Sequence, residues 1–201
     1  MVHYYAVLDF ECTCWERMDE PDPSRQHEII EFPVVFVNSS TLETDFEFHE
    51  FVRPTENPIL SEFCIQLTGI KQNQVDDADD LQTVLNRLDD FLNSNKIDDF
   101  TICTDGPWDI SKFIGPEAKR KGIHVPPWAL KWLDVRMKFQ HVYRLESRIG
   151  LEAMLGHIGL EFAGRPHSGI DDTRNIARIV RAIHAKIGKG VIRKNRRLAI
   201  D

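Results

Sequence analysis

The segment Tyr4-Tyr5-Ala6-Val7-Leu8-Asp9-Phe10-Glu11 organises the fold of this 201-residue chain. Its apolar, β-rich start and acidic end are typical of a buried strand that finishes in polar side chains. Side chains at positions i and i+2 of a strand share a face. We therefore expect Asp9 and Glu11 to converge while Phe10 points to the opposite face.

Two converging carboxylates repel each other and lose hydration unless a cation lies between them. Oxygen ligands of this kind suit Mg²⁺ or Mn²⁺. The alternative is an exposed strand end on which Asp9 and Glu11 are both solvated. The pair alone does not decide between these two interpretations.

Outward from this segment, the hydrophobic pattern predicts four more strands and a series of helices. The strands are expected over residues 28–38, 45–52, 100–103 and within 129–135. The helices are expected over residues 61–67, 79–94, 108–122 with a break near Pro116, directly after 135, near 151–158, and over 172–187. Three consecutive strands, then strands alternating with helices, predict an α/β fold: a mixed five-stranded sheet flanked by helices.

Length and composition indicate one globular domain. With 42% hydrophobic and 28% charged residues, the chain is too apolar for general disorder. The formal net charge of −7 argues against nucleic-acid binding through bulk charge, but basic residues concentrate from Arg174 onward. We expect a folded domain over residues 1–190 and a basic tail over residues 191–201 that either binds phosphates or is solvated.

The four cysteines, Cys12, Cys14, Cys64 and Cys103, are better explained as thiols than as disulfides or zinc ligands. Cys12 and Cys14 are too close in sequence for a favourable bridge, and no second close pair completes a zinc site. No secretory signal precedes the first strand, and no apolar run approaches the length of about 20 residues that a membrane span needs. The expected location is intracellular, in the cytoplasm, the nucleus or both, with no membrane partner.

Two later clusters could bring further acidic side chains to the same place. Asp105 and Asp109 follow the fourth predicted strand, at its junction with a helix. His167 stands in a loop, and Asp171 and Asp172 open the last helix. Each cluster has an ordinary alternative, because Asp is a favoured N-cap residue and a loop histidine is usually a surface residue.

Taken together, these residues resemble the DEDDh family of 3′→5′ exonucleases over about residues 3–187. The likeness is greatest to the branch of histone-mRNA and enhanced-RNAi exonucleases. Five segments in one order carry it: Leu8-Asp9-Phe10-Glu11-Cys12-Thr13-Cys14, Glu28-Ile29-Ile30-Glu31-Phe32-Pro33-Val34-Val35, Phe63-Cys64-Ile65-Gln66-Leu67-Thr68-Gly69-Ile70, Thr104-Asp105-Gly106-Pro107-Trp108-Asp109, and Gly164-Arg165-Pro166-His167-Ser168-Gly169-Ile170-Asp171-Asp172-Thr173-Arg174-Asn175-Ile176-Ala177. The resemblance implies an RNase H-like fold. It also implies a metal-dependent 3′→5′ exoribonuclease that releases nucleoside 5′-monophosphates from single-stranded RNA or 3′ overhangs.

The same resemblance implies a role for each of the residues that carry chemistry. Asp9 would bridge two Mg²⁺ ions, for which Mn²⁺ could substitute. Glu11 and Asp172 would complete the ligands of the first ion, and Asp109 would support the second. His167 would act as general base, since imidazole can accept a proton near neutral pH.

Binding of the terminal nucleotide is expected from a second group of residues. The resemblance implies that Phe63 and Trp108 hold the last base by stacking, which tolerates any base. Leu67, Thr68 and Gly69 would line the sugar pocket through their backbone. The alternative for the two aromatic residues is core packing, which is the usual fate of aromatic side chains near short helices.

Two other functions remain open at the level of the sequence. A DNA exonuclease would use the same five residues, because only a pocket that engages the 2′-OH separates RNA from DNA. A catalytically silent RNA-binding module is the alternative from another class. It has no physical need for the complete acidic set and His167, so we expect an enzyme whose partner is nucleic acid, RNA rather than DNA.

Overall fold

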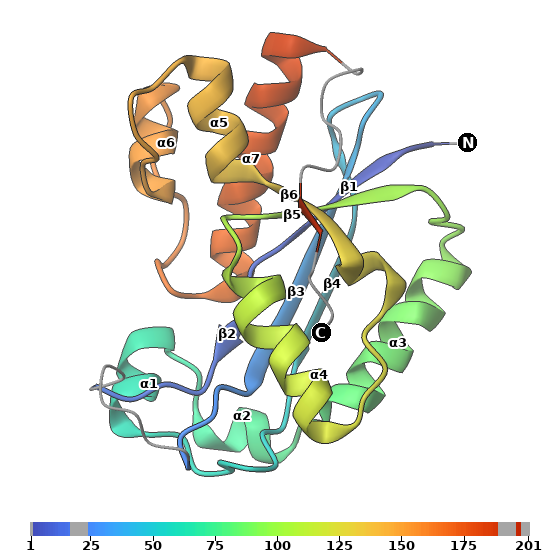
Figure 1. The fold of residues 1–201 in the computed structure, drawn as a ribbon, viewed down its shortest axis with the longest axis vertical. Coiled ribbons are helices and arrows are strands. Elements are labelled where there is room, and N and C mark those ends of the chain that lie inside the picture. Colours follow the sequence, from blue (N-terminus) through green and yellow to red (C-terminus); the bar gives the residue numbers. More distant parts are fainter. Residues whose placement is uncertain (1, 17–23, 189–195, 198–201) are drawn as a thin grey trace.

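The computed structural model describes residues 2–16, 24–188 and 196–197. Its centre is a mixed sheet with the order β2-β3-β1-β5-β6-β7, and β4 pairs with β3 (Figure 1). The strands are β1 (Tyr4–Leu8), β2 (Glu11–Cys12), β3 (Ile29–Asn38), β4 (Thr44–Phe51), β5 (Phe100–Thr104), β6 (Lys131–Asp134) and β7 (Arg196–Arg197).

The predicted helices are all present in order, together with two short helices over residues 72–76 and 127–130 that were not predicted. They are α1 (Glu62–Thr68), α2 (Gln72–Asp76), α3 (Leu81–Ser94), the π-helix η1 (Asp109–Ile114), α4 (Gly115–Lys121), the 3₁₀ helix η2 (Pro127–Leu130), α5 (Val135–Tyr143), α6 (Leu151–His157) and α7 (Gly169–Ile187). The predicted break near Pro116 is confirmed as a change from π to α geometry at Gly115, which places Pro116 at the start of α4.

All five predicted strands are present, and the α/β class with a mixed, helix-flanked sheet is confirmed. β1, β3 and β4 pair antiparallel, whereas β1, β5 and β6 pair parallel. The predicted number of five strands is wrong, because β2 and β7 add two more. Each has only two residues, too few to leave a periodic pattern in the sequence.

The basic tail predicted over residues 191–201 lies mostly outside the described residues. Within the described part, Arg196 and Arg197 pair antiparallel with Trp132 and Lys131 of the edge strand β6. The boundary at residue 190 stays a prediction.

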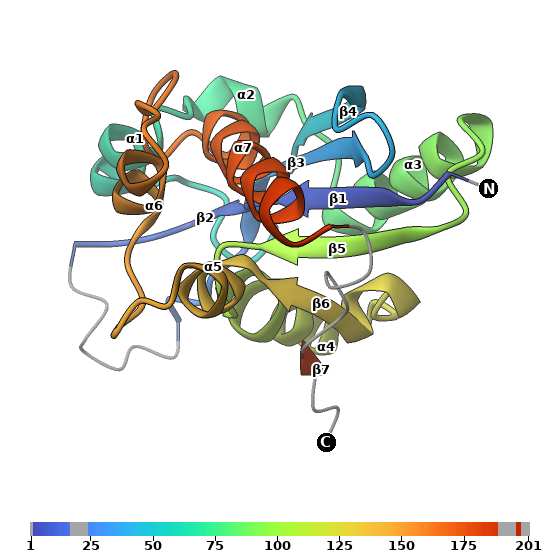
Figure 2. The same cartoon turned by 90° about the horizontal axis from the view of Figure 1, so that it is seen from above.

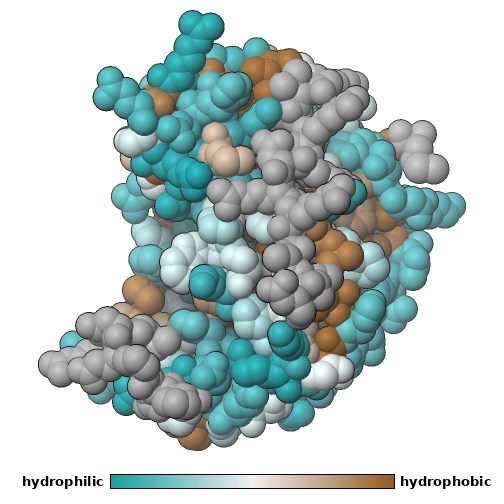
Figure 3. All heavy atoms as spheres, viewed as in Figure 1, coloured by the Kyte–Doolittle hydropathy of each residue, from teal (hydrophilic) through white to brown (hydrophobic). Residues whose placement is uncertain are grey.

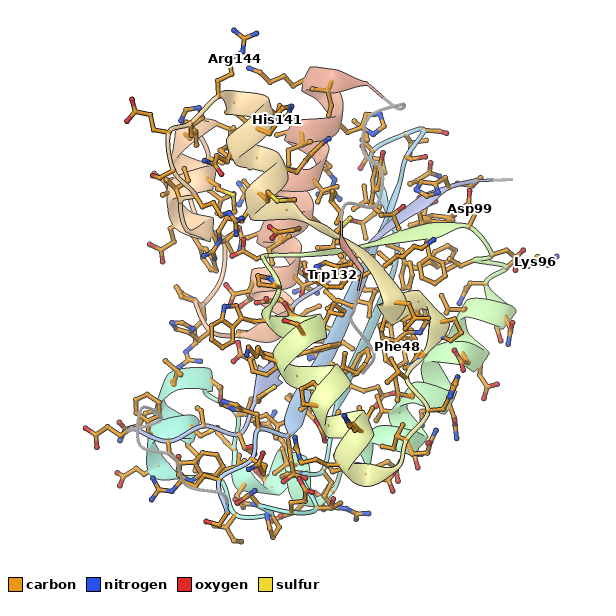
Figure 4. The ribbon with its side chains drawn as sticks, viewed as in Figure 1. Phe48, Lys96, Asp99, Trp132, His141 and Arg144 are labelled. Carbon is orange, nitrogen blue, oxygen red and sulfur yellow. The ribbon has the colours of Figure 1, made fainter. Side chains whose placement is uncertain are left out.

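Alternation along the strands divides the core into two layers. Tyr5 and Val7 of β1 pack against α5, α6 and α7, whereas Ala6 and Leu8 pack against α3 and η1. Figures 1 and 2 show α5, α6 and α7 grouped together and α3 set apart from them. Figure 4 labels Trp132, one of the side chains that completes the α3 layer. The sheet is thus covered on both faces, so all ten residues of β3 are buried.

Helix α1 closes one end of the sheet and shows how local sequence sets an element. Ser61 accepts a hydrogen bond from the N–H of Cys64 at the N-terminus, and Gly69 ends the helix with φ +75°. Both signals were visible in the sequence. Cys64 packs with Ile30 of β3 in a small separate core that ties α1 to the sheet.

In the part of the chain that the structure describes, no helix is long and apolar enough to cross a membrane. The face in Figure 3 is mostly hydrophilic, with smaller hydrophobic groups. All four cysteines are free thiols, as predicted.

Candidate active site

The acidic segment after β1 interrupts the sheet instead of continuing a regular strand. β1 pairs with β3 up to Leu8 and Val34, and pairing resumes in β2 at Glu11. In this register Pro33, which has no N–H to donate, lies opposite Asp9. Phe10 nevertheless points into the part of the core that packs against α3, on the face of the sheet that was predicted. The local strand geometry is broken at Asp9, yet the predicted division of side chains between two faces holds.

Asp109 reaches this interruption from the segment that follows the neighbouring strand β5. It is the first residue of the π-helix η1, is 3% exposed, and its Oδ1 accepts the backbone N–H of Phe10 at 2.8 Å. The gap in the ladder of β1 is therefore filled by a side chain. Asp109 is more than a helix cap, since it joins the segment after β5 to the acidic end of β1.

The loop before α7 brings the histidine to the same edge of the sheet. His167 is exposed and has φ +61°, an uncommon backbone conformation for a residue with a side chain. Its N–H donates to Oδ2 of Asp172 at 2.9 Å, and Asp172 is 8% exposed. Asp171 instead accepts the N–H of Arg165 at 2.9 Å, so it shapes the loop.

Three of the predicted residues meet closely enough to share one cation. Possible ligand atoms of Glu11, His167 and Asp172 all lie within 4.8 Å of one another. Asp9 and Asp109 adjoin this group. Burial raises the pKa of Asp9 well above its ordinary value, and the neighbouring charges of Asp109 and Asp172 raise it further. A set of hard carboxylate oxygens in this arrangement fits Mg²⁺ or Mn²⁺.

The electrostatics of the site support the same fit. Burial and the neighbouring Asp172 raise the pKa of Glu11 to about 8. Burial raises the pKa values of Asp109 and Asp172 to about 7 each, against the lowering effect of the hydrogen bonds that they accept. Each shift records mainly the cost of burying a negative charge without a counter-ion. Bound divalent cations would remove that cost.

The acidic edge opens into a cleft of about 520 Å³. Asp9, Asp172 and His167 line it together with Asp105 and Arg136. Asp105 holds the Arg136 guanidinium with two hydrogen bonds, one of them from Nε to Oδ1 at 3.1 Å. Asp105 thus lies at the site, although its partner is a cation from α5 and it does not fill the place of Asp109.

The two predicted stacking residues are exposed. Trp108 is 56% exposed and Phe63 is 37% exposed, and both belong to the few large hydrophobic side chains on the described surface. The core-packing alternative is therefore wrong for both. Exposed aromatic side chains are suited to stacking on a base.

The predicted sugar-pocket residues form the end of α1. Thr68 is buried, and its hydroxyl donates to the carbonyl of Cys64 at 2.8 Å. Arg165 donates to the carbonyl of Leu67 at 3.0 Å, and its guanidinium lies where a Cβ on Gly69 would stand. Arg165 therefore joins the helix of Phe63 to the histidine loop.

Sequence reasoning assigned no role to Glu31, Arg136 or Arg165. Glu31 is 2% exposed and accepts hydrogen bonds from the first two N–H groups of α7. No local signal reveals these contacts, since the partners are separated by 138 and 139 positions for Glu31 and by 31 for Arg136. The segments containing Glu31 and Arg165 were identified, but the contacts that these residues make were not.

Comparison with known proteins gives a consistent result. The family model described as "Exonuclease" (RNase_T) matches residues 6–180. The chain is 43% identical to human 3′-5′ exoribonuclease 1 over 180 residues, which cover 88% of this chain and 51% of that protein. It therefore spans about half the length of this relative.

Two solved structures are similar over most of the chain. The nuclease domain of 3′hExo, a DEDDh family member bound to rAMP, aligns with a TM-score of 0.90 and 39% identity over 97% of each chain. A 3′-exonuclease in a structure of 3′-end-specific recognition of a histone mRNA stem-loop aligns with a TM-score of 0.85 and 40% identity, over 92% of this chain and 82% of that one. The DEDDh-type, RNase H-like fold is confirmed. The chain belongs to the RNase_T exonuclease family.

Proposed function

We propose that the chain is a metal-dependent 3′→5′ exoribonuclease that releases nucleoside 5′-monophosphates from single-stranded RNA or 3′ overhangs. The observation that carries this proposal is the meeting of Glu11, His167 and Asp172 within 4.8 Å at one edge of the sheet. One half-buried and one buried carboxylate group adjoin them, and two large aromatic side chains are exposed. We place the enzyme inside the cell, in the cytoplasm, the nucleus or both, consistent with its free thiols.

The carboxylates have the role of holding divalent cations. Asp9, Glu11 and Asp172 would hold one Mg²⁺ ion, and Asp9 with Asp109 a second, with Mn²⁺ as a substitute. When bound, such a pair supplies neutralisation of charge at the phosphate and at the leaving oxygen. The raised pKa values of Glu11, Asp109 and Asp172 support this role, because the carboxylates are stabilised as anions only when a positive charge arrives.

His167 has the role of general base toward the attacking water. Its ring is exposed at the cleft, and the hydrogen bond from its N–H to Asp172 fixes its backbone next to the carboxylates. An imidazole ring nitrogen is the group that most often serves as a general base in enzymes.

Phe63 and Trp108 would hold the terminal base between them, and Leu67, Thr68 and Gly69 would line the sugar. The exposure of the two aromatic side chains supports their part in this role. A base bound in this way brings its phosphodiester toward the acidic edge. Arg136 in the same cleft offers a guanidinium to the phosphate backbone.

RNA is preferred over DNA in this proposal on the basis of the relatives. Human 3′-5′ exoribonuclease 1 is named for action on RNA, and the 3′hExo nuclease domain was solved with rAMP. A DNA 3′→5′ exonuclease remains the second candidate, since stacking and carboxylates do not distinguish the two sugars.

A single experiment tests the proposal. Matched 5′-labelled single-stranded RNA and DNA are incubated with the purified chain, in Mg²⁺ or in EDTA. The proposal predicts a ladder of RNA products shortened from the 3′ end, nucleoside 5′-monophosphates as the released species, and no cutting in EDTA. Faster cutting of DNA would favour the second candidate, and no cutting of either would leave only a binding module.

A further inference from the structure

Glu31 is a buried carboxylate that the proposed chemistry does not use. It lies in the interior strand β3, which pairs with β1, β2 and β4, and is 2% exposed. Its Oε2 accepts the N–H of Gly169 at 2.9 Å, and its Oε1 accepts the N–H of Ile170 at 3.1 Å. The Oε1 atom is also 2.8 Å from Nε2 of His49 on β4.

These contacts cap the N-terminus of α7 from outside the helix. The residue at the N-cap position, Ser168, makes no side-chain capping bond. The first N–H groups of a helix need acceptors, and a carboxylate there is further favoured by the helix dipole. Hydrogen bonds to an ionised acceptor are stronger than neutral ones, particularly where water is excluded. Glu31 therefore supplies the acceptors for the first two N–H groups of α7.

The contact also presses α7 against the end of β1. A Cβ on Gly169 would lie 2.9 Å from the carbonyl oxygen of Asp9 and 3.1 Å from the Glu31 carboxyl group. Glycine is required at this point because backbone and carboxylate leave no room for a side chain. Asp172 belongs to the first turn of the same helix, and His167 lies two residues before Gly169.

We propose that Glu31 is a positioning residue that sets His167 and Asp172 relative to Asp9, with His49 orienting its carboxylate. This inference rests on the proposed function. Catalytic groups need placement to a fraction of an ångström, and misplacement by 1 Å can cost about 100-fold in rate. Loss of the Glu31 contacts allows the first turn of α7 to shift against β1. His167 and Asp172 then shift with the helix.

The alternative is that Glu31 only adds stability to the fold. Glu47 on β4 provides a matched control. Its Oε2 accepts a hydrogen bond from Nη2 of Arg174 in α7 at 2.6 Å, and this ion pair is exposed. Glu31→Gln and Glu47→Gln make the same chemical change to a sheet glutamate that holds α7. Of these two glutamates, only Glu31 contacts the first turn of α7.

The test uses the full chain with 5′-labelled single-stranded RNA and Mg²⁺, well below the melting temperature of each variant. We expect Glu31→Leu to lower kcat about 100-fold and Glu31→Gln about 10-fold, with KM within about threefold of wild type, because the change acts on the geometry of the reacting groups. Glu47→Gln is expected to keep both constants within about twofold, as an exposed pair contributes little. Partial recovery by Gln reflects the one carbonyl oxygen that it retains.

A double-mutant comparison separates positioning from stability. If Glu31 acts through His167, Glu31→Leu costs much less in a His167→Asn background, less than about tenfold, because residues that act as a unit are not additive. Equal losses in both backgrounds would overturn the proposal. So would a folded Glu31→Leu with kcat within about threefold of wild type. If Glu31→Leu does not fold, Glu31→Gln decides by the same comparisons, and a Gln variant equal to Glu47→Gln overturns the proposal.

A readout without catalysis distinguishes this inference from the proposed function. Mn²⁺ should raise the melting temperature of the wild-type chain by mass action. We expect this increase to be at least halved in Glu31→Gln and unchanged in Glu47→Gln. A wild-type chain that binds Mn²⁺ but cuts no RNA would overturn the proposed function alone. Equal Mn²⁺ shifts in the two variants would overturn the role of Glu31 alone.

Discussion

The backbone N–H of His167 donates a hydrogen bond to Oδ2 of Asp172 over 2.9 Å. The histidine and the carboxylate five residues later are thereby one structural unit. The bond holds His167 at φ +61°, a conformation that a residue with a side chain rarely adopts without support. Changes at His167 must therefore be designed so that the loop survives the loss of the imidazole.

Replacement of His167 should remove chemistry and leave binding intact. Asn tolerates positive φ better than Ala does, so His167→Asn keeps the loop and removes the base. We expect turnover to fall about 10²–10⁴-fold with little change in RNA affinity, the usual effect of a lost general base. Single-turnover kinetics and filter binding measure the two quantities. Near wild-type turnover at pH 7 in both His167→Asn and His167→Ala would exclude the general-base role.

The two aspartates after β5 should respond differently to the same substitution. Asp109→Asn removes a buried carboxylate of the cluster, and we expect a loss of activity of more than about 10³-fold, as for Asp9→Ala. Asp105→Asn only weakens the pair with Arg136, and we expect less than about tenfold. Equal losses in the two Asn variants, measured with saturating Mg²⁺, would contradict the assignment of Asp109.

The stability of the metal-free chain should fall as the pH rises. The folded-state pKa values of about 7 for Asp109 and Asp172 and about 8 for Glu11 lie above their ordinary values of 3.8 and 4.5. Between about pH 4 and 8 the folded state thus holds protons that the unfolded chain has lost, and stability decreases across this interval. Thermal unfolding in EDTA at pH 5, 7 and 9 should show the decrease, and Mn²⁺ should reduce it. A melting temperature that rises from pH 5 to 9 in EDTA would contradict the buried cluster.

Trp108→Ala should affect substrate binding more than chemistry. Stacking on a terminal base contributes about 1–3 kcal/mol. If this is mainly ground-state binding, KM rises and kcat changes less. Steady-state kinetics on a short RNA measures both. A fall in kcat at constant KM would instead assign Trp108 to the transition state.

The proposed enzyme should require a free 3′ end. In the proposed binding mode, with the terminal base held between Phe63 and Trp108, an internal nucleotide would have to continue past the bound base, whereas a terminal one would not. We expect a 5′-labelled RNA with a 3′-hydroxyl to be cut from that end, and single strands to be cut faster than blunt duplexes, whose last base must first leave its stack. A circular RNA cut at a comparable rate would show an endonuclease.

Local signals explain how much of the fold followed from the sequence. Ser61 and Gly69 delimit α1, and the apolar spacing of residues 81–92 predicts α3, because caps and periodicity are properties of neighbouring residues. The first turn of α7 was placed three residues too late. Its N–H groups are satisfied by Glu31, 138 positions away, and a cap of this kind leaves no local trace.

The residue types and the order of the site could be predicted from the sequence, whereas contacts between distant segments could not. The types and order of the acidic residues and His167 were sufficient to group them by resemblance, and the structure places Glu11, His167 and Asp172 together. The metal set and the stacking roles stay predictions. The contacts of Arg136 and Arg165 depend on which helices and loops meet in space, so they required the folded chain.

The break between β1 and β2 contains one amide whose hydrogen exchange reports on the acidic edge of the sheet. The amide hydrogen of Phe10 is held by Oδ1 of Asp109, whereas the neighbouring amides of β1 belong to the sheet. Protection of this amide against exchange with deuterium thus depends on the position of one side chain and not on opening of the whole sheet. The exchange rate at Phe10 follows local opening of the acidic edge in solution, separately from global unfolding.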